Sequence, residues 1–119
     1  MAVRGIGIDI VKVPRLKQLV DRWDRKFLDR VFTDTELDYC FSARRKHEHL
    51  AGRFAAKEAV IKALGEKIPW KSINVESERN GRPFVLVERD EGKDNLNENL
   101  HISITHLEDY ALAIAVLET

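Results

Sequence analysis

An alternating segment near the N-terminus most limits the folds open to this chain. Residues 3–11, VRGIGIDIV, have the period of two that is typical of a β-strand. One face carries three isoleucines, Ile6, Ile8 and Ile10. The other face carries Gly5, Gly7 and Asp9, so bare backbone precedes the carboxylate. Such a face lets something bulky come close to Asp9.

Helical signals occupy the middle of the chain. Pro14 suits the first turn of a helix, and apolar residues then recur at helical spacing at Leu16, Leu19, Val20, Trp23 and Phe27. Thr33 and Glu36 have the spacing of a capping box, which predicts a short second helix. A third helix is expected over residues 45–64, with Gly65 as its C-terminal glycine.

Strands are expected in the last third of the chain, in two pairs. Asn80-Gly81 is a strong signal for a hairpin turn, and residues 88–100 are polar and predict a loop. The expected strands cover residues 73–75, 84–87, 101–105 and 110–117. One face of the last strand would let a helix approach closely, because its residues are Ala111, Ala113 and Ala115.

The order of these elements predicts the fold class. One strand, three helices and four further strands give an α+β domain with a mainly antiparallel sheet. The length of 119 residues fits a single domain over residues 1–119. No stretch approaches the roughly 20 apolar residues that span a bilayer, and the N-terminus lacks the pattern of a signal peptide. We therefore expect a cytoplasmic protein that does not enter a membrane.

Glu58 is the least expected residue of the third helix. At about 100° per residue it lies about 40° from Phe54 and about 60° from Ile61, within the apolar stripe of the helix. A carboxylate facing a core is costly unless it is paired or binds a metal ion. An ion pair with Lys62, four residues later, is one explanation. A Mg²⁺ site shared with Asp9 is the other, since one or two carboxylates plus substrate phosphates often hold Mg²⁺.

The remaining polar residues leave alternatives open. Basic and acidic residues balance at 20 each, but residues 12–30 hold seven basic against three acidic side chains. This surface is either a solvated helix face or a docking site for an acidic protein or a nucleic acid. His106 either serves a cleft or belongs to a turn, whereas His47 and His49 are expected to be exposed. The single cysteine, Cys40, is expected to be a small buried residue.

Known sequence motifs reduce the number of functions that the chain could have. The chain lacks a GxSxG elbow, a Walker loop, an HExxH motif and a dinucleotide GxGxxG, so those mechanisms lose support. Five segments do form a recognisable set: GIGIDIV at 5–11, FTDTELDYC at 32–40, AGRFAAKEAVIKALG at 51–65, GRPF at 81–84 and SITHLEDYALAIAVLE at 103–118. Together, over nearly the whole chain, they resemble the holo-acyl-carrier-protein synthases of the 4′-phosphopantetheinyl transferase superfamily.

The resemblance implies roles for individual residues. Asp9 and Glu58 match the Mg²⁺ ligands of the family, and Lys62 matches the lysine beside the phosphates, where it stabilises or protonates the leaving 3′,5′-ADP. The positions that match the lining of the coenzyme A cleft are Arg53, Gly65, Pro83 and His106. The basic helix matches the surface that receives the acidic acyl carrier protein, with candidate contacts at Arg15, Arg22 and Lys26.

The implied activity is transfer of 4′-phosphopantetheine from coenzyme A to a carrier serine, in fatty acid biosynthesis. The serine hydroxyl would attack the β-phosphate in line, and either Glu58 or a water on the metal ion would remove its proton. The family also implies a homotrimer with each active site between neighbouring subunits, and no nucleic-acid partner.

The chain departs from the family pattern after Gly65. Relatives usually continue with a small-residue Thr-Gly segment and a longer loop, whereas EKIPW follows here at residues 66–70. A shorter loop with an acidic residue would weaken or rearrange contacts to coenzyme A. Two alternatives stay open: a small module that binds acidic proteins or nucleic acid without chemistry, and a transferase that serves the carrier domains of peptide or polyketide synthases.

Overall fold

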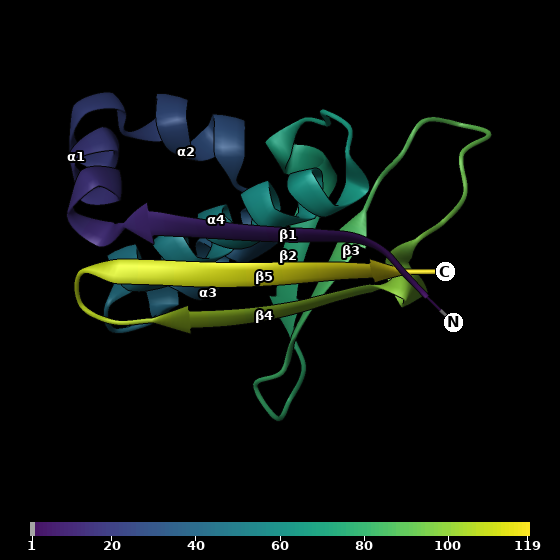
Figure 1. Ribbon diagram of the computed structural model, residues 1–119. Coiled ribbons are helices and arrows are strands. Elements are labelled where there is room, and N and C mark those ends of the chain that lie inside the picture. The colour runs from purple at the N-terminus through teal and green to yellow at the C-terminus, as the bar shows by residue number, and fades with distance from the viewer. Residues whose placement is uncertain (1) are drawn as a thin grey trace.

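A three-stranded sheet and one long helix organise the molecule. The structure, a computed structural model, describes residues 2–119 (Figure 1). Its strands are β1 Val3–Lys12, β2 Ile73–Ser77, β3 Pro83–Val87, β4 Leu100–His106 and β5 Tyr110–Glu118. Its helices are α1 Val13–Trp23, α2 Arg25–Val31, α3 Asp34–Ser42 and α4 Lys46–Leu64, with short 3₁₀ turns η1 Trp70–Ser72 and η2 Asn97–Asn99. Helix α4 packs against β1, β5 and β4, and the other helices and the β2–β3 hairpin surround it.

The strand pairs within residues 2–119 are antiparallel, and they form two sheets. Strand β5 lies between β1 and β4 in one sheet, and β2 pairs with β3 in a separate hairpin. The buried side chains of Ile73, Val75 and Val85 place the hairpin in the same core as α4. The predicted α+β class with antiparallel strands is confirmed. The strands are divided between two sheets because α4 offers the hairpin an apolar surface of its own.

The glycine and alanine faces of the larger sheet both meet α4. Gly7 pairs with Ala115 across β1 and β5, and Asp9 pairs with Ala113. A Cβ atom added at Gly7 would lie only 1.9 Å from the carbonyl oxygen of Ala59 in α4. The close approach predicted for this face is therefore made by the backbone of the helix. It sets the strand that carries Asp9 directly against α4.

The first expected helix is divided in the structure. Helix α1 ends at Trp23, Asp24 has a φ of 48°, and α2 begins at Arg25. Beyond this break Leu28 is buried, and Phe27 makes edge contacts with two other aromatic rings. The prediction of one continuous helix is wrong, because apolar spacing does not record a residue with a positive φ. Aspartate adopts a positive φ more readily than most residues do.

The other predicted helix boundaries are confirmed. Thr33 Oγ accepts a hydrogen bond from the Glu36 amide at 3.2 Å, and Glu36 Oε1 accepts one from the Thr33 amide at 2.8 Å, which completes the capping box. Gly65 ends α4 with a φ of 73°, which glycine adopts without strain. No helix within residues 2–119 has the length and apolar character needed to cross a membrane. The cytoplasmic location stays a prediction.

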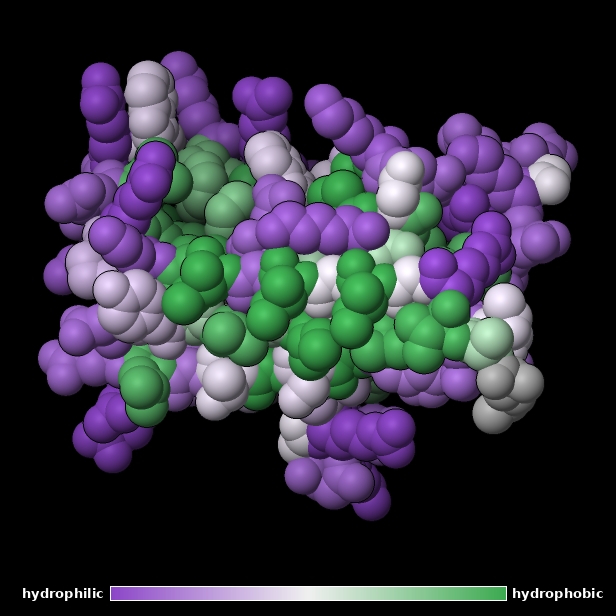
Figure 2. Space-filling model, viewed as in Figure 1, coloured by the Kyte–Doolittle hydropathy of each residue, from purple (hydrophilic) through white to green (hydrophobic). Residues whose placement is uncertain are grey.

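The outer face of the larger sheet is apolar over β1 and β5 (Figure 2). On β1, Ile6, Ile8 and Ile10 are 62%, 56% and 59% exposed. Their partners on β5 are half-buried apolar residues, Val116, Ile114 and Leu112. A contiguous apolar surface of this kind marks an interaction site rather than a face in contact with water.

Candidate functional site

The two carboxylates predicted to act together line one cavity. Its volume is about 500 Å³, and it lies between the end of β1, helix α1 and the middle of α4. Asp9 and Glu58 are both half-buried residues of its wall, with Phe54 and Tyr110 beside them. The close packing at Gly7 places β1 and α4 so that these side chains share the cavity. The structure thus brings together residues that are far apart in the sequence.

Lys62 is paired with Asp9 in this site. Its Nζ donates to the carbonyl oxygen of Ile8 at 2.8 Å and lies 3.3 Å from Asp9 Oδ1. Among the ion pairs of the described residues, none joins Lys62 to Glu58, so the pairing suggested by helical spacing is not made. The Lys62 side chain is 53% exposed, and a pair of this kind adds little stability. Its cation is therefore accessible to an anionic ligand that approaches Asp9.

Glu58 has a partner that the sequence analysis missed. The indole Nε1 of Trp70 donates a hydrogen bond to Glu58 Oε1 at 3.0 Å. Trp70 is the last residue of the segment that departs from the family pattern, and it begins η1. The contact depends on the path of that segment, and no spacing rule within one element could have predicted it.

The two carboxylates fit a magnesium ion better than a structural metal. Within residues 2–119 no group of three or more histidine, cysteine, aspartate or glutamate side chains is placed to hold a metal ion. Mg²⁺ needs fewer protein ligands, because it retains waters and takes further oxygens from substrate phosphates. Asp9 and Glu58 provide that limited set of hard oxygen donors on one cavity wall.

Three of the residues matched to the coenzyme A cleft line a second hollow. Arg53, Pro83 and His106 surround a space of about 120 Å³. The Arg53 guanidinium lies 4.0 Å from the centre of the Tyr39 ring, and Arg53 Nε has no hydrogen-bond partner within the part of the chain described. The fourth matched residue, Gly65, is not part of this hollow, because it ends α4.

One carboxylate and a row of aromatic rings hold His106 in that hollow. His106 Nδ1 lies 3.0 Å from Oε1 of the buried Glu48. His49 packs between His106 and Tyr39, with ring centres 5.0 and 5.5 Å away. The expectation that His47 and His49 are exposed is therefore wrong, because both are half-buried. Burial, followed by the nearby charges of His106 and Arg53, lowers the pKa of His49.

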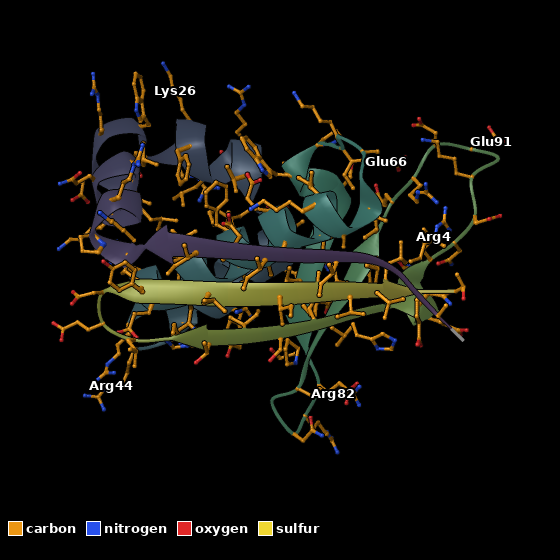
Figure 3. The ribbon with its side chains drawn as sticks, viewed as in Figure 1. Arg4, Lys26, Arg44, Glu66, Arg82 and Glu91 are labelled. Carbon is orange, nitrogen blue, oxygen red and sulfur yellow. The ribbon has the colours of Figure 1, made fainter. Side chains whose placement is uncertain are left out.

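The acidic residue of the altered loop is neutralised within the loop itself. Glu66 Oε1 accepts hydrogen bonds from Arg89 at 3.0 and 3.3 Å, and Lys93 lies 3.5 Å from Glu66 Oε2. The hydrogen bond from Arg89 is the main cause of a lowered pKa at Glu66. Figure 3 shows Glu66 just beyond the end of α4, on the side of the long loop that carries these cations. Glu66 is therefore not an unpaired negative charge beside a phosphate site.

A buried ion pair lies behind the site. Lys57 Nζ is 2.8 Å from Glu36 Oε1, and neither side chain has exposed surface. Glu36 Oε2 also accepts a hydrogen bond from the Val75 amide at 2.7 Å. Burial lowers the pKa of Lys57, and the charge of Glu36 opposes that effect. The sequence analysis identified Glu36 only as a capping residue, so it missed this connection between α3, α4 and β2.

The predicted docking residues are exposed on α1 and α2. Arg15 lies on α1 and also lines the cavity with Asp9, whereas Arg22 stacks over the neighbouring Trp23 at 5.1 Å. Lys26 on α2 points away from the body of the molecule (Figure 3). These cations therefore extend from the cavity across one end of the structure.

Comparison with known proteins identifies close relatives of the whole chain. A family model described as the 4′-phosphopantetheinyl transferase superfamily matches residues 5–115. A holo-[acyl-carrier-protein] synthase from Halothermothrix orenii is 41% identical over 122 residues, which cover 98% of this chain and 98% of the relative. One from a Geobacillus species is 42% identical over 120 residues, covering 96% and 95%.

Solved structures agree with the sequence relatives. A holo-(acyl-carrier-protein) synthase from Bacillus anthracis, in complex with CoA (3′,5′-ADP), superimposes with a TM-score of 0.82 at 32% identity and covers 98% of this chain and 97% of its own. The Helicobacter pylori enzyme in complex with coenzyme A has a TM-score of 0.81 at 30% identity, with 95% and 99% covered.

Proposed function

The chain belongs to the 4′-phosphopantetheinyl transferase superfamily, and we propose that it is a holo-acyl-carrier-protein synthase. It transfers the 4′-phosphopantetheine group of coenzyme A to a serine of an apo acyl carrier protein and releases 3′,5′-ADP. The carrier then serves fatty acid biosynthesis. The observation that carries this proposal is that Asp9 and Glu58 line one cavity and that Lys62 pairs with Asp9, because two carboxylates and a cation suit a metal-bound diphosphate. Residues 1–119 form one such transferase domain in this proposal.

Asp9 and Glu58 would hold Mg²⁺, and their placement on one wall supports this role. When bound, the ion neutralises charge on the diphosphate of coenzyme A. Lys62 adds a second positive charge beside Asp9, where it stabilises the phosphate oxygens of the departing 3′,5′-ADP. Attack by the serine forms the bond from Oγ to the β-phosphorus and breaks the bond from that phosphorus to the leaving group. The serine proton passes to Glu58 or to water.

Each active site in this proposal combines two copies of the chain. Arg53 and Glu58 lie five residues apart on α4, which separates them by about 140° around the helix at about 100° per residue. They line different hollows of one copy, which supports a site that takes one hollow from each of two neighbouring copies. Arg53, Pro83 and His106 of one copy would bind coenzyme A at the Asp9 and Glu58 cavity of a neighbour. Gly65 stays a predicted contact of the same ligand.

A homotrimer would cover the apolar outer face of the larger sheet. The three exposed isoleucines of β1 and their half-buried β5 partners have no cover within residues 2–119. Association of three copies through this face would remove it from water. The same closed arrangement gives three equivalent sites, one at each boundary between copies.

The basic end of the molecule would receive the carrier protein. Arg15 lies at the edge of the cavity, and Arg22 and Lys26 extend the positive surface away from it. An acidic carrier bound there would have its serine near Asp9. Such charges mainly speed encounter and orient the partner, so their effect should weaken at high salt.

Intact-mass analysis of a carrier protein tests the proposed function. An apo acyl carrier protein is incubated with this protein, coenzyme A and Mg²⁺, and a parallel sample contains EDTA. The proposal predicts a mass increase of one phosphopantetheine group that EDTA abolishes. No mass increase with acyl carrier proteins from several sources, although the protein is folded, would contradict it and favour a binding module. A gain only on carrier domains of peptide or polyketide synthases would contradict the proposed substrate.

A further inference from the structure

Trp70 links the proposed metal site to the buried core behind it. We propose that Trp70 is a positioning residue that orients the carboxylate of Glu58, and that the Lys57–Glu36 ion pair holds Trp70 in place. The inference rests on the proposed role of Glu58 and adds a residue that acts through it. It assigns a purpose to a buried ion pair that the reaction itself does not use.

The indole of Trp70 is held both through its N–H group and through its ring. Its Nε1–H donates to Glu58 Oε1 at 3.0 Å, and its ring makes an edge contact with Phe54 at 5.8 Å between centres. An indole N–H only donates hydrogen bonds, so it engages one carboxylate oxygen and cannot act as a base. Within the described residues Glu58 Oε2 has no hydrogen bond. One oxygen is therefore anchored, and the other is available to a ligand.

The backbone of Trp70 is anchored by the residue next to Glu58. Lys57 Nζ donates to the Trp70 carbonyl oxygen at 2.9 Å and also to the carbonyl oxygen of Ile73. The same ammonium pairs with Glu36, so its position is set by three acceptors in a site without solvent. Consecutive residues of α4 thus hold Trp70 at two points, Lys57 at the main chain and Glu58 at the side chain.

This arrangement explains why a costly buried charge pair lies behind the cavity. Hydrophobic residues of the same size would often stabilise a core as well as a buried ion pair does. An ammonium in this place does something that they could not do, because it fixes the carbonyl groups of Trp70, the first residue of η1, and of Ile73, the residue that follows η1. Partners that orient a metal ligand commonly change metal affinity by about 10- to 100-fold when removed.

The hydrogen bond can be tested in the free protein by ¹H–¹⁵N NMR of the indole groups. The chain has two tryptophans, Trp23 and Trp70, and the Trp23→Phe variant assigns their signals. In Glu58→Ala the Trp70 indole signal should shift and its proton should exchange faster with water, whereas the Trp23 signal stays in place. An unchanged Trp70 signal in a folded Glu58→Ala variant would overturn the inference and would leave the proposed function unaffected.

Metal affinity tests the consequence of that bond. Binding of Mn²⁺ is followed by electron paramagnetic resonance in the presence of coenzyme A. Trp70→Phe keeps the ring against Phe54 and removes the donor, so it should weaken Mn²⁺ binding about 10-fold. Trp23→Phe, the matched control, should bind Mn²⁺ as the wild type does.

The outcomes separate the inference from the function on which it rests. Wild-type Mn²⁺ affinity in a folded Trp70→Phe variant would overturn the inference alone. Failure of the wild-type protein to bind Mn²⁺ with coenzyme A would overturn the metal site and the inference together. A purely structural role predicts a lower melting temperature with unchanged metal affinity. The positioning role predicts instead that the Mg²⁺ concentration for half-maximal transfer rises about 10-fold, while kcat is restored at high Mg²⁺.

Discussion

Glu58 carries the two most informative contacts of the site, because it faces the cavity with Asp9 and accepts the hydrogen bond from Trp70. A glutamine in its place keeps an oxygen for the indole and loses the negative charge. The position therefore separates the requirement for a charged metal ligand from the requirement for a folded site.

Glu58→Gln should lower kcat of phosphopantetheine transfer by about 10²-fold or more, because it removes one of the two charged side chains proposed to hold the metal ion. Initial rates of carrier modification measure the effect. The matched control is Glu98→Gln in η2, an exposed residue away from the cavity, which should leave the rate unchanged. Near-normal turnover of a folded Glu58→Gln variant would contradict the assignment.

Cys40 lies fully buried in the core between the helices. Its side chain has no exposed surface, and burial raises the pKa of its thiol to about 12. At pH 8 the reactive thiolate is then about one part in ten thousand. Iodoacetamide should leave the native protein unmodified over an hour and label it fully in guanidinium chloride, as mass spectrometry would show. Rapid labelling of the native protein would contradict this burial.

The functional role of a single residue was predictable where its side chain was unusual for its position in the sequence pattern. Asp9 followed two glycines and Glu58 interrupted an apolar stripe, and each anomaly indicated the cavity before the fold was known. Lys57 and Trp70 were missed, because a lysine in a helix and a tryptophan in a loop are ordinary in sequence. Their roles arise from contacts between elements, such as the pairing of Lys57 with Glu36.

At the scale of the elements, the contact between β1 and α4 sets the site. Gly7 leaves room for the carbonyl oxygen of Ala59, and β1 and α4 are in extensive contact around this point. The glycine and alanine faces made this contact predictable. The division of the first helix at Asp24 was not predictable, since apolar spacing does not record a positive φ. The separation of the hairpin from the sheet was not predictable either, since it depends on contacts between elements.

Gly7→Ala should destabilise the protein by about 3 kcal/mol or more, because overpacking against rigid backbone is not relieved by side-chain rotation. Guanidinium unfolding measures the free energy of unfolding. In the control, Gly52→Ala, the new Cβ meets only the end of the Ile104 side chain, at 3.0 Å, and alanine favours the helix by about 1 kcal/mol. A Gly7→Ala protein as stable as the Gly52→Ala protein would contradict the close contact.

At the scale of the whole molecule, the exposed isoleucine face and the two separate hollows point to the same assembly. Ile8 lies in the middle of that face, so Ile8→Lys should convert the proposed trimer to monomers and abolish transfer. Light scattering of the protein as it elutes from a size-exclusion column gives the mass of the assembly. Thr35→Lys, on the exposed side of α3, is the control and should remain a trimer. A trimeric Ile8→Lys protein would show that another surface forms the assembly.

The central claim is that transfer takes place where the Asp9 and Glu58 cavity of one copy meets the Arg53 and His106 hollow of another. Glu58→Gln is co-assembled with equal amounts of an Arg53→Gln/His106→Ala variant, and native mass spectrometry verifies mixed trimers. Each variant alone should be inactive, and the mixture should recover about one quarter of wild-type turnover, because about one boundary in four joins two intact halves. Mixed trimers that remain inactive beside an active wild type would contradict the claim.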